Sequence, residues 1–173
     1  INTVVKLLKD VGVACAKYQD IHLRGLPCKT IQCDEIWSFC YAKQKNVPEN
    51  KQGRFGYGDV WTWTAIDADT KLVASWLVGS RDAGYAFRLM RDLQARLANR
   101  VQMTTDGHKA YLTAVEDVFG ADIDYAMLVK LYGKEPESEK RYSPAKCIGA
   151  EPHTIQGNPD PSKISTSYAE RQN

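Results

Sequence analysis

The sequence predicts a mixed α/β domain whose sheet holds three antiparallel strands and then two further strands, with flanking helices. Apolar segments at 31–43, 59–67 and 71–79 follow one another through polar connections, as consecutive antiparallel strands do. Two later apolar segments, 101–105 and 122–130, alternate with amphipathic helical patterns. With 173 residues, 43% of them apolar, the chain can bury one core of this size.

The first 29 residues are expected to form a helical lead-in to this domain. INTVVKLLKDVG carries apolar residues at helical spacing, which predicts a short helix that ends at Gly12. A second helical stretch is expected from Ala14 to about Arg24. Gly25 and Pro27 then break the helix and lead into the first strand.

IQCDEIWSFCYAK (31–43) is expected to be a central strand, because apolar residues occupy both of its faces. Asp34 and Glu35 lie in the middle of this segment, where a buried charge needs a partner. A metal ion can be that partner. Adjacent strand residues point to opposite faces, so the two acids are expected to serve different sites. We expect Glu35 to pair with a basic residue on the face opposite Asp34 and to stay outside a catalytic site.

The later elements follow from turn and cap residues. NVPENKQGRFGYG (46–58) is expected to be a loop, and residues 67–70 form the turn before the third strand. Asp82 is a plausible N-cap of a helix that reaches about Ala98, and Gly120 is expected to end the next helix.

The segment 131–163 is crowded with proline, glycine and charge, so we expect an insertion there, with a small hairpin around 146–157. ISTSYAERQN then begins a final helix. The resulting order β-β-β-α-β-α-β is that of a ribonuclease H-like domain.

Three acids occupy landmarks of this layout: Asp34 in the first strand, Asp106 at the end of the fourth, and Glu170 in the last helix. Each also has a structural interpretation. Asp106 can be a turn or cap residue, Glu170 can belong to a capping box with Ser167, and Asp34 can be one of a pair of structural acids.

The ribonuclease H-like arrangement favours a joint role for the three acids. Strands one and four are neighbours in that sheet, so Asp34 and Asp106 can converge, and the last helix can bring Glu170 to them. Three carboxylates suit Mg²⁺ or Mn²⁺ rather than zinc. Two such ions can activate water or a 3′-hydroxyl and stabilise a leaving oxygen, which is nuclease and strand-transfer chemistry.

Composition excludes several other classes. Five cysteines without CxxC spacing argue against a disulfide framework or a cysteine-rich zinc site. No stretch approaches the roughly 20 apolar residues of a membrane span, so no membrane partner is expected and the cytoplasm is the default location. A formal net charge of +2 gives only weak support for a polyanionic partner.

Six strings of the sequence together resemble the bacterial insertion sequence 1 family of transposases. They are CDEIWSF, GDVWTWTAIDADTKL, TDGHKAYL, DYAMLVKLYG, RYSPAKCIG and ISTSYAERQN. The resemblance implies a DDE triad at Asp34, Asp106 and Glu170 that binds two Mg²⁺ or Mn²⁺ ions. It also implies transposon-end and target double-stranded DNA as partners, a homo-oligomer on that DNA, and a place in the bacterial cytoplasm at the nucleoid.

The resemblance further implies that residues 1–29 are the remnant of a helix-turn-helix DNA-binding segment and that residues 30–173 are the catalytic domain. Both ends are then expected to be truncated relative to full-length family members. Four side chains are candidates for DNA contact: His108, Lys109, Arg171 and Asn173. For His108 and Lys109, which follow the second acid, a solvated role at a helix start is the alternative.

Two rival functions stay open at this point. A ribonuclease H-like nuclease, such as a junction resolvase, would cut DNA without joining the products. A catalytically inactive transposase remnant would only bind DNA or a partner.

Overall fold

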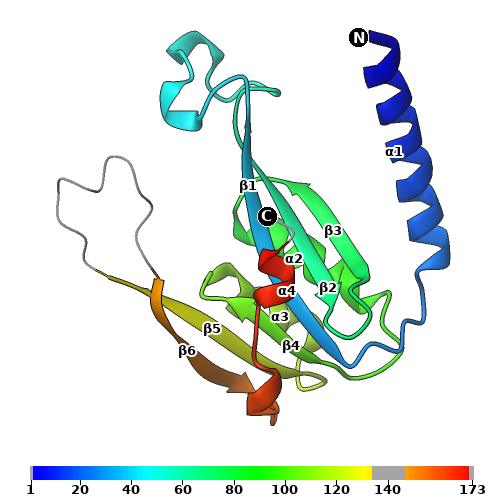
Figure 1. Cartoon of the computed structure of the whole chain (residues 1–173), viewed down its shortest axis with the longest axis vertical. Coiled ribbons are helices and arrows are strands. Elements are labelled where there is room, and N and C mark those ends of the chain that lie inside the picture. Colours follow the sequence, from blue (N-terminus) through cyan, green and yellow to red (C-terminus); the bar gives the residue numbers. More distant parts are fainter. Residues whose placement is uncertain (1, 134–146, 172–173) are drawn as a thin grey trace.

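The computed structural model describes residues 2–133 and 147–171, which are built around one six-stranded sheet (Figure 1). The strand order is β3-β2-β1-β4-β5-β6. In chain order the strands are β1 (Thr30–Cys40), β2 (Gly58–Asp67), β3 (Val73–Gly79), β4 (Gln102–Asp106), β5 (Asp124–Tyr132) and β6 (Cys147–Gln156).

Strand pairing confirms the ribonuclease H-like class. The first three strands pair antiparallel, whereas β4 lies parallel to both β1 and β5. β1 is therefore central, as its two apolar faces predict. β1 and β4 are neighbours, so the residues that follow Cys33 and Thr105, which are register partners, come side by side.

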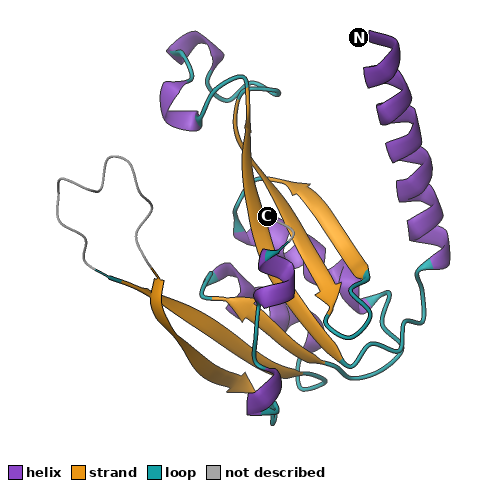
Figure 2. Cartoon of the chain, viewed as in Figure 1, coloured by secondary structure: helices purple, strands orange, loops and turns teal. Residues whose placement is uncertain are grey.

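One face of the sheet packs against α2 (Ala83–Gln94) and α3 (Ala110–Phe119), and the core lies between them (Figure 2). Its largest fully buried side chains include Trp63, Tyr111, Tyr125, Leu89 and Met103. Asp82 caps α2 by accepting a hydrogen bond from the backbone N–H of Tyr85, as predicted. The predicted extension of this helix to Ala98 is wrong, because α2 ends at Gln94.

The opposite face of the sheet carries α4 (Ser167–Glu170) over β1 and β2 (Figure 1). The side-chain oxygen of Gln32 on β1 accepts the backbone N–H groups of Tyr168 and Ala169 at 2.8 and 3.4 Å. Ala169 is fully buried. These contacts hold the last described helix on the face of β1 to which Gln32 and Asp34 belong.

The N-terminal segment forms one continuous helix, α1 (Asn2–His22), so the predicted end at Gly12 is wrong. A glycine inside a helix costs only about 1 kcal/mol relative to alanine, so a single glycine does not have to end one. None of the residues of α1 is buried. No helix in the described parts of the chain is long and apolar enough to cross a membrane.

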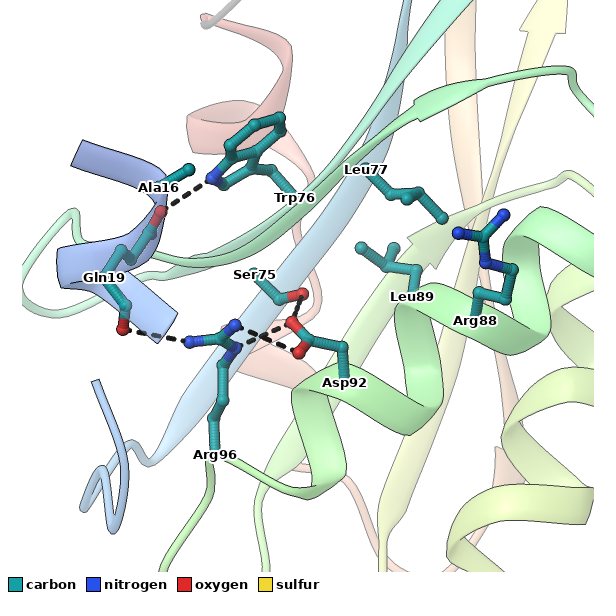
Figure 3. A pocket seen from close by; sticks show the side chains of 9 residues that line it. All are labelled: Ala16, Gln19, Ser75, Trp76, Leu77, Arg88, Leu89, Asp92 and Arg96. Atoms are coloured by element: carbon teal, nitrogen blue, oxygen red, sulfur yellow. Dashed lines mark hydrogen bonds and ion pairs between the residues drawn. The ribbon is translucent and has the colours of Figure 1, made fainter. Parts of the chain in front are cut away.

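Only the C-terminal turns of α1 are attached to the domain, around a cavity of about 320 Å³ (Figure 3). Trp76 donates to the side chain of Gln19 at 2.6 Å, and the nearly buried Arg96 donates to the backbone oxygen of Gln19 at 3.2 Å. Arg96 also pairs with Asp92 at 2.7 Å, and Asp92 accepts from Ser75. This polar network anchors α1, while the rest of the helix extends from the domain.

The predicted hairpin around 146–157 is wrong, because the segment does not fold back to pair with itself. This segment is the single strand β6, which pairs antiparallel with β5 and becomes the edge of the sheet. It looks like a loop in the sequence because an edge strand tolerates Pro152 and has little apolar alternation. Of the predicted insertion 131–163, residues 134–146 lie outside the described part of the chain. The remainder includes a short 3₁₀ helix, η3 (Pro161–Lys163).

Candidate metal centre

The centre of the candidate site lies where β4 ends beside the longer β1. Asp34 is on β1, and Asp106 is the last residue of β4, one position beyond the register pair Cys33–Thr105. Ligand oxygens of Asp34, Glu35 and Asp106 all lie within 4.8 Å of one another. The structure therefore brings together the two aspartates that the sequence singles out, and it adds Glu35 to them. These three residues are called the acidic cluster below.

The expectation that Asp34 and Glu35 serve different sites is wrong. The Asp34 carboxylate turns along the strand, where its Oδ1 accepts the backbone N–H of Glu35 at 2.9 Å. β4 stops at Asp106, so carboxylates from both faces of β1 can meet beyond its end. Strand alternation fixes the face from which each side chain leaves the backbone. Beyond the end of the neighbouring strand β4, the carboxylates of Asp34 and Glu35 can nevertheless approach each other.

Burial makes the charges of Asp34 and Glu35 unfavourable. Both residues are only 6% exposed. Burial, followed by the charge of Asp106, raises the pKa of Asp34 to about 6 and the pKa of Glu35 to about 7. A bound cation stabilises the charged form of such carboxylates, so metal binding at this site would compete with protons.

The expected basic partner of Glu35 is Arg81, in the connection between β3 and α2. The guanidinium lies 3.0 Å from Glu35 and 3.5 Å from Asp106, and 4.8 Å from the ring centroid of Trp61. Arg81 therefore neutralises part of the acidic cluster from its solvent side. Its side chain is 36% exposed, so it can leave this position without a large desolvation change.

The second carboxylate oxygen of Glu35 is also buried. The Glu35 side chain is 1% exposed, and its Oε1 has almost no contact with solvent. The neighbouring buried group is the hydroxyl of Tyr111, and a hydrogen bond between the two side chains lowers the pKa of Glu35. Burial, followed by the charge of Glu35, raises the pKa of Tyr111 well above its usual value. Carboxylate oxygens are the ligands that hard cations prefer, so the acidic cluster fits Mg²⁺ or Mn²⁺.

Glu170 occupies a different position from the acidic cluster. Its carboxylate pairs with Lys130 of β5 at 3.0 Å and accepts a hydrogen bond from Thr166. Burial opposes its charge, but these two hydrogen bonds outweigh burial and lower the pKa of Glu170. Its charge still reaches Asp34, because Lys130 lowers and Glu170 raises the pKa of that residue. Among the described residues, Glu170 is near the acidic cluster but not one of the acids that meet within 4.8 Å.

The candidate DNA-contacting residues lie partly in one cleft. His108 and Lys109 line a cleft of about 530 Å³ together with Arg81, Asp106 and Lys130. The backbone N–H of His108 donates to Asp106 at 3.0 Å. Burial, followed by the charge of Arg81, lowers the pKa of His108, which favours the neutral form of its ring.

The two remaining candidates are at the C-terminal end of the described chain. The Arg171 guanidinium lies 5.5 Å from the ring of Tyr168 in α4, and Arg171 is not among the residues that line the cleft. Asn173 lies outside the described residues.

Sequence reasoning missed Arg81 and Lys130 as parts of this site. Arg81 comes directly after the third predicted strand and directly before the cap Asp82. The available signal was its position: a basic residue at the end of a strand close to the strand that carries Asp34 and Glu35. Lys130 closes the fifth predicted strand, and its position carries no pattern that distinguishes it from a solvated lysine. Only the packing of β5 and α4 brings it to Glu170.

Comparisons with known proteins give a distant structural likeness. No protein-family profile matches the sequence, and no curated protein does. Among solved structures, a piggyBac transposase in a synaptic complex with hairpin DNA is similar at a TM-score of 0.41 and 14% sequence identity. The likeness covers 69% of this chain and 27% of that chain, so this protein spans about a quarter of its length.

Proposed function

We propose that the protein is a metal-dependent DNA transposase whose acidic cluster takes part in phosphoryl transfer. The observation that supports this most is the convergence of Asp34, Glu35 and Asp106, whose ligand oxygens lie within 4.8 Å of one another. All the ligand atoms are carboxylate oxygens, and this donor set favours Mg²⁺ or Mn²⁺ over zinc or copper.

Asp34 and Asp106 are the residues proposed to hold two metal ions. The sequence resemblance implies Glu170 as the third acid of the DDE triad. In the acidic cluster, the acid that lies beside Asp34 and Asp106 is Glu35. When bound, two divalent ions activate water or a 3′-hydroxyl and stabilise the leaving oxygen of a phosphodiester. The acids themselves position these ions and carry no covalent intermediate.

Basic side chains of the cleft are suited to the DNA backbone. Arg81, Lys109 and Lys130 line the same cleft as Asp106. Contacts of such residues with phosphates fix the position of a duplex without reading its sequence. In this proposal the cleft orients the scissile phosphate toward Asp34 and Asp106.

The six sequence strings support assignment to the insertion sequence 1 family, and this assignment is part of the proposal. It brings transposon-end and target DNA as substrates, a homo-oligomer on DNA as the active form, and the bacterial cytoplasm as the location. In this proposal residues 1–29 belong to a DNA-binding segment. The projection of α1 from the domain with no buried residue is compatible with it.

One observation favours the second candidate function, a domain that binds DNA without cutting it. Glu170 is engaged by Lys130 at 3.0 Å and by Thr166, and these contacts stabilise its present position. A triad acid held in this way would have to exchange Lys130 for a metal ion. Failure of that exchange would leave only the acidic cluster to bind the metal.

A titration with Mn²⁺ and Mg²⁺ followed by thermal unfolding tests the proposal. A ligand that binds only the folded state raises the melting temperature, so the assay reports on the site directly. The parent chain is compared with Asp34→Ala, Asp106→Ala and Glu170→Ala, and with Asp117→Ala on the exposed side of α3 as the matched control. Nicking of supercoiled DNA and joining of a 3′-hydroxyl end are measured on the same proteins.

The proposal expects metal to stabilise the parent and the control, and not the two cluster variants. Activity that cuts and joins supports a transposase, whereas cutting without joining supports a nuclease. Metal binding without either activity supports the DNA-binding alternative. If metal stabilises Asp34→Ala and Asp106→Ala as much as the parent, the acidic cluster is not a metal site.

A further inference from the structure

The connection between β1 and β2, residues 41–57, forms a projecting arm (Figure 1). Two short 3₁₀ helices, η1 (Gln44–Asn46) and η2 (Glu49–Lys51), shape it. Val47 is 4% exposed, and its backbone oxygen accepts a hydrogen bond from the Gln52 side chain at 3.2 Å. The arm is therefore a folded unit with its own buried residue rather than an irregular tether.

The arm carries a concentrated positive charge. Residues 41–57 include four basic side chains and one acidic side chain, Glu49, for a formal charge of +3. The whole chain has a formal charge of +2, so all other residues together sum to −1. The basic residues of the arm are Lys43, Lys45, Lys51 and Arg54. A local formal charge of +3 on a short projecting segment attracts a polyanion.

Aromatic rings alternate with these cations. Lys43 lies 4.9 Å from the ring of Trp37, and Lys51 lies 4.5 and 5.2 Å from the rings of Tyr41 and Tyr57. Trp37 and Tyr41 are 40% and 62% exposed. Exposed rings next to cations are the combination that proteins use to stack on bases while neutralising phosphates.

Phe55 lies in the last part of the arm, three residues before β2 begins at Gly58. It is fully exposed, and it lies between Gly53 and Gly56, whose φ angles of +70° and +85° favour glycine. Arg54 precedes it directly. A ring in this position contributes nothing to the core of the domain. It resembles the apolar wedges that enter between base steps of a bound duplex.

We propose that the arm is a DNA-binding element in which the basic side chains contact phosphates and Phe55 stacks on or between bases. This inference rests on the proposed function, because it takes the duplex that the acidic cluster acts on as its ligand. Seven residues of extended chain separate Asp34 from Tyr41, which is about 23 Å. The base of the arm at Tyr41 is then about seven base pairs from the reacting phosphate, at about 3.4 Å per base pair.

A protein partner fits this surface less well than DNA. Cores of protein–protein interfaces are depleted of lysine, and here lysines lie directly on the exposed rings. A phosphate backbone, in contrast, accepts the same lysines without leaving their charges buried and unpaired.

Fluorescence anisotropy with a labelled duplex of about 30 base pairs tests the proposal in buffer containing EDTA, so that no metal ion contributes. Phe55→Ala is compared with Phe87→Ala, an exposed phenylalanine of α2, and Arg54→Gln is compared with Arg91→Gln on the same helix. Loss of one stacking contact is expected to weaken binding about 5- to 100-fold. Loss of one phosphate contact is expected to reduce the slope of log K against log salt by about 0.9.

A second readout uses a duplex that contains 2-aminopurine, whose fluorescence rises when a neighbouring base is unstacked. The parent is expected to raise this fluorescence and Phe55→Ala is not. Equal DNA affinity of all five proteins overturns the arm proposal, and so does a parent that does not bind DNA at all.

Two further measurements separate the arm from the acidic cluster and from self-association. If metal stabilises Phe55→Ala as much as the parent, the metal centre is intact in the variant. A change in DNA binding is then due to the arm, and the proposed function of the acidic cluster is tested independently of it. If Phe55→Ala instead dissociates a dimer while its DNA affinity is unchanged, the arm is a protein interface and the proposal is wrong.

Discussion

Replacing Glu35 with glutamine removes a buried charge that the fold tolerates only because of its partners. The Glu35 side chain is 1% exposed, and burial followed by the charge of Asp106 raises its pKa from 4.5 to about 7. The folded protein therefore holds the Glu35 proton more tightly than the unfolded chain does. As the pH rises from about 4.5 to 7, the unfolded chain releases the Glu35 proton before the folded protein does. The free energy of unfolding therefore falls over this range.

The size of the effect follows from the pKa difference. The rise from 4.5 to about 7 corresponds to about 3 kcal/mol of lost stability once the pH is above 7. In Glu35→Gln the side chain carries no charge, and its amide oxygen can still accept a hydrogen bond from Arg81. The substitution also removes the Arg81–Glu35 ion pair. The net increase in the free energy of unfolding at pH 8 is therefore expected to be about 1–3 kcal/mol, or about 3–10 °C in melting temperature. At pH 5 the gain is expected to shrink to less than about 1 kcal/mol, because Glu35 is then protonated in the folded state.

Thermal unfolding at pH 8 and pH 5 in EDTA measures this difference, with Glu116→Gln on the exposed face of α3 as the control. The same proteins are then titrated with Mn²⁺ at pH 8. Glu35→Gln is expected to be more stable than the parent without metal and to gain less from Mn²⁺. A variant that is less stable than the parent at pH 8, or equally stabilised at both pH values, would refute the argument from burial.

Further substitutions test the neighbouring charges. Asp106→Asn removes the largest charge effect on both Asp34 and Glu35, so the decline of stability between pH 5 and pH 8 is expected to become shallower in urea unfolding curves. Arg81→Met leaves Glu35 without its 3.0 Å partner, and a loss of about 1–2 kcal/mol at pH 8 is expected, with recovery on addition of Mn²⁺ in the same unfolding assay. Lys130→Met removes the partner of Glu170, which is expected to raise the pKa values of Glu170 and Asp34 in carboxyl NMR titrations; unchanged values would show that the ion pair does not form in solution. Arg96→Met breaks the network under α1, and amide exchange in the last turns of α1 is expected to accelerate while exchange in β1 does not.

Local pattern was sufficient for much of the fold. Apolar residues on both faces of 31–43 predicted a central strand, and β1 lies between β2 and β4. The end of the fourth strand at Asp106 and the cap at Asp82 were also correct. These features depend on periodicity and on backbone hydrogen bonds between near neighbours, and both are encoded in short segments.

Local pattern failed where distant segments decide the structure. β6 carries Pro152 and few alternating apolar residues, so only its pairing with β5 identifies it as a strand. Gly12 is a different kind of failure: it looked like a helix end, yet α1 continues through it to His22. In both cases short-range sequence pattern predicted the wrong element: a hairpin instead of the strand β6, and a helix end instead of the continuous helix α1.

The sequence by itself determined the order of the first five strands and of the two helices between them, and through the fold class that this order predicts, the proximity of Asp34 to Asp106. Tertiary structure alone decided which charges meet. Glu35 joins the acidic cluster since β4 stops at Asp106, Arg81 reaches it from the connection after β3, and Lys130 reaches Glu170 across β5 and α4. Electrostatic partners depend on where strands end and on how side chains are buried, and these are properties of the assembled fold rather than of any one segment.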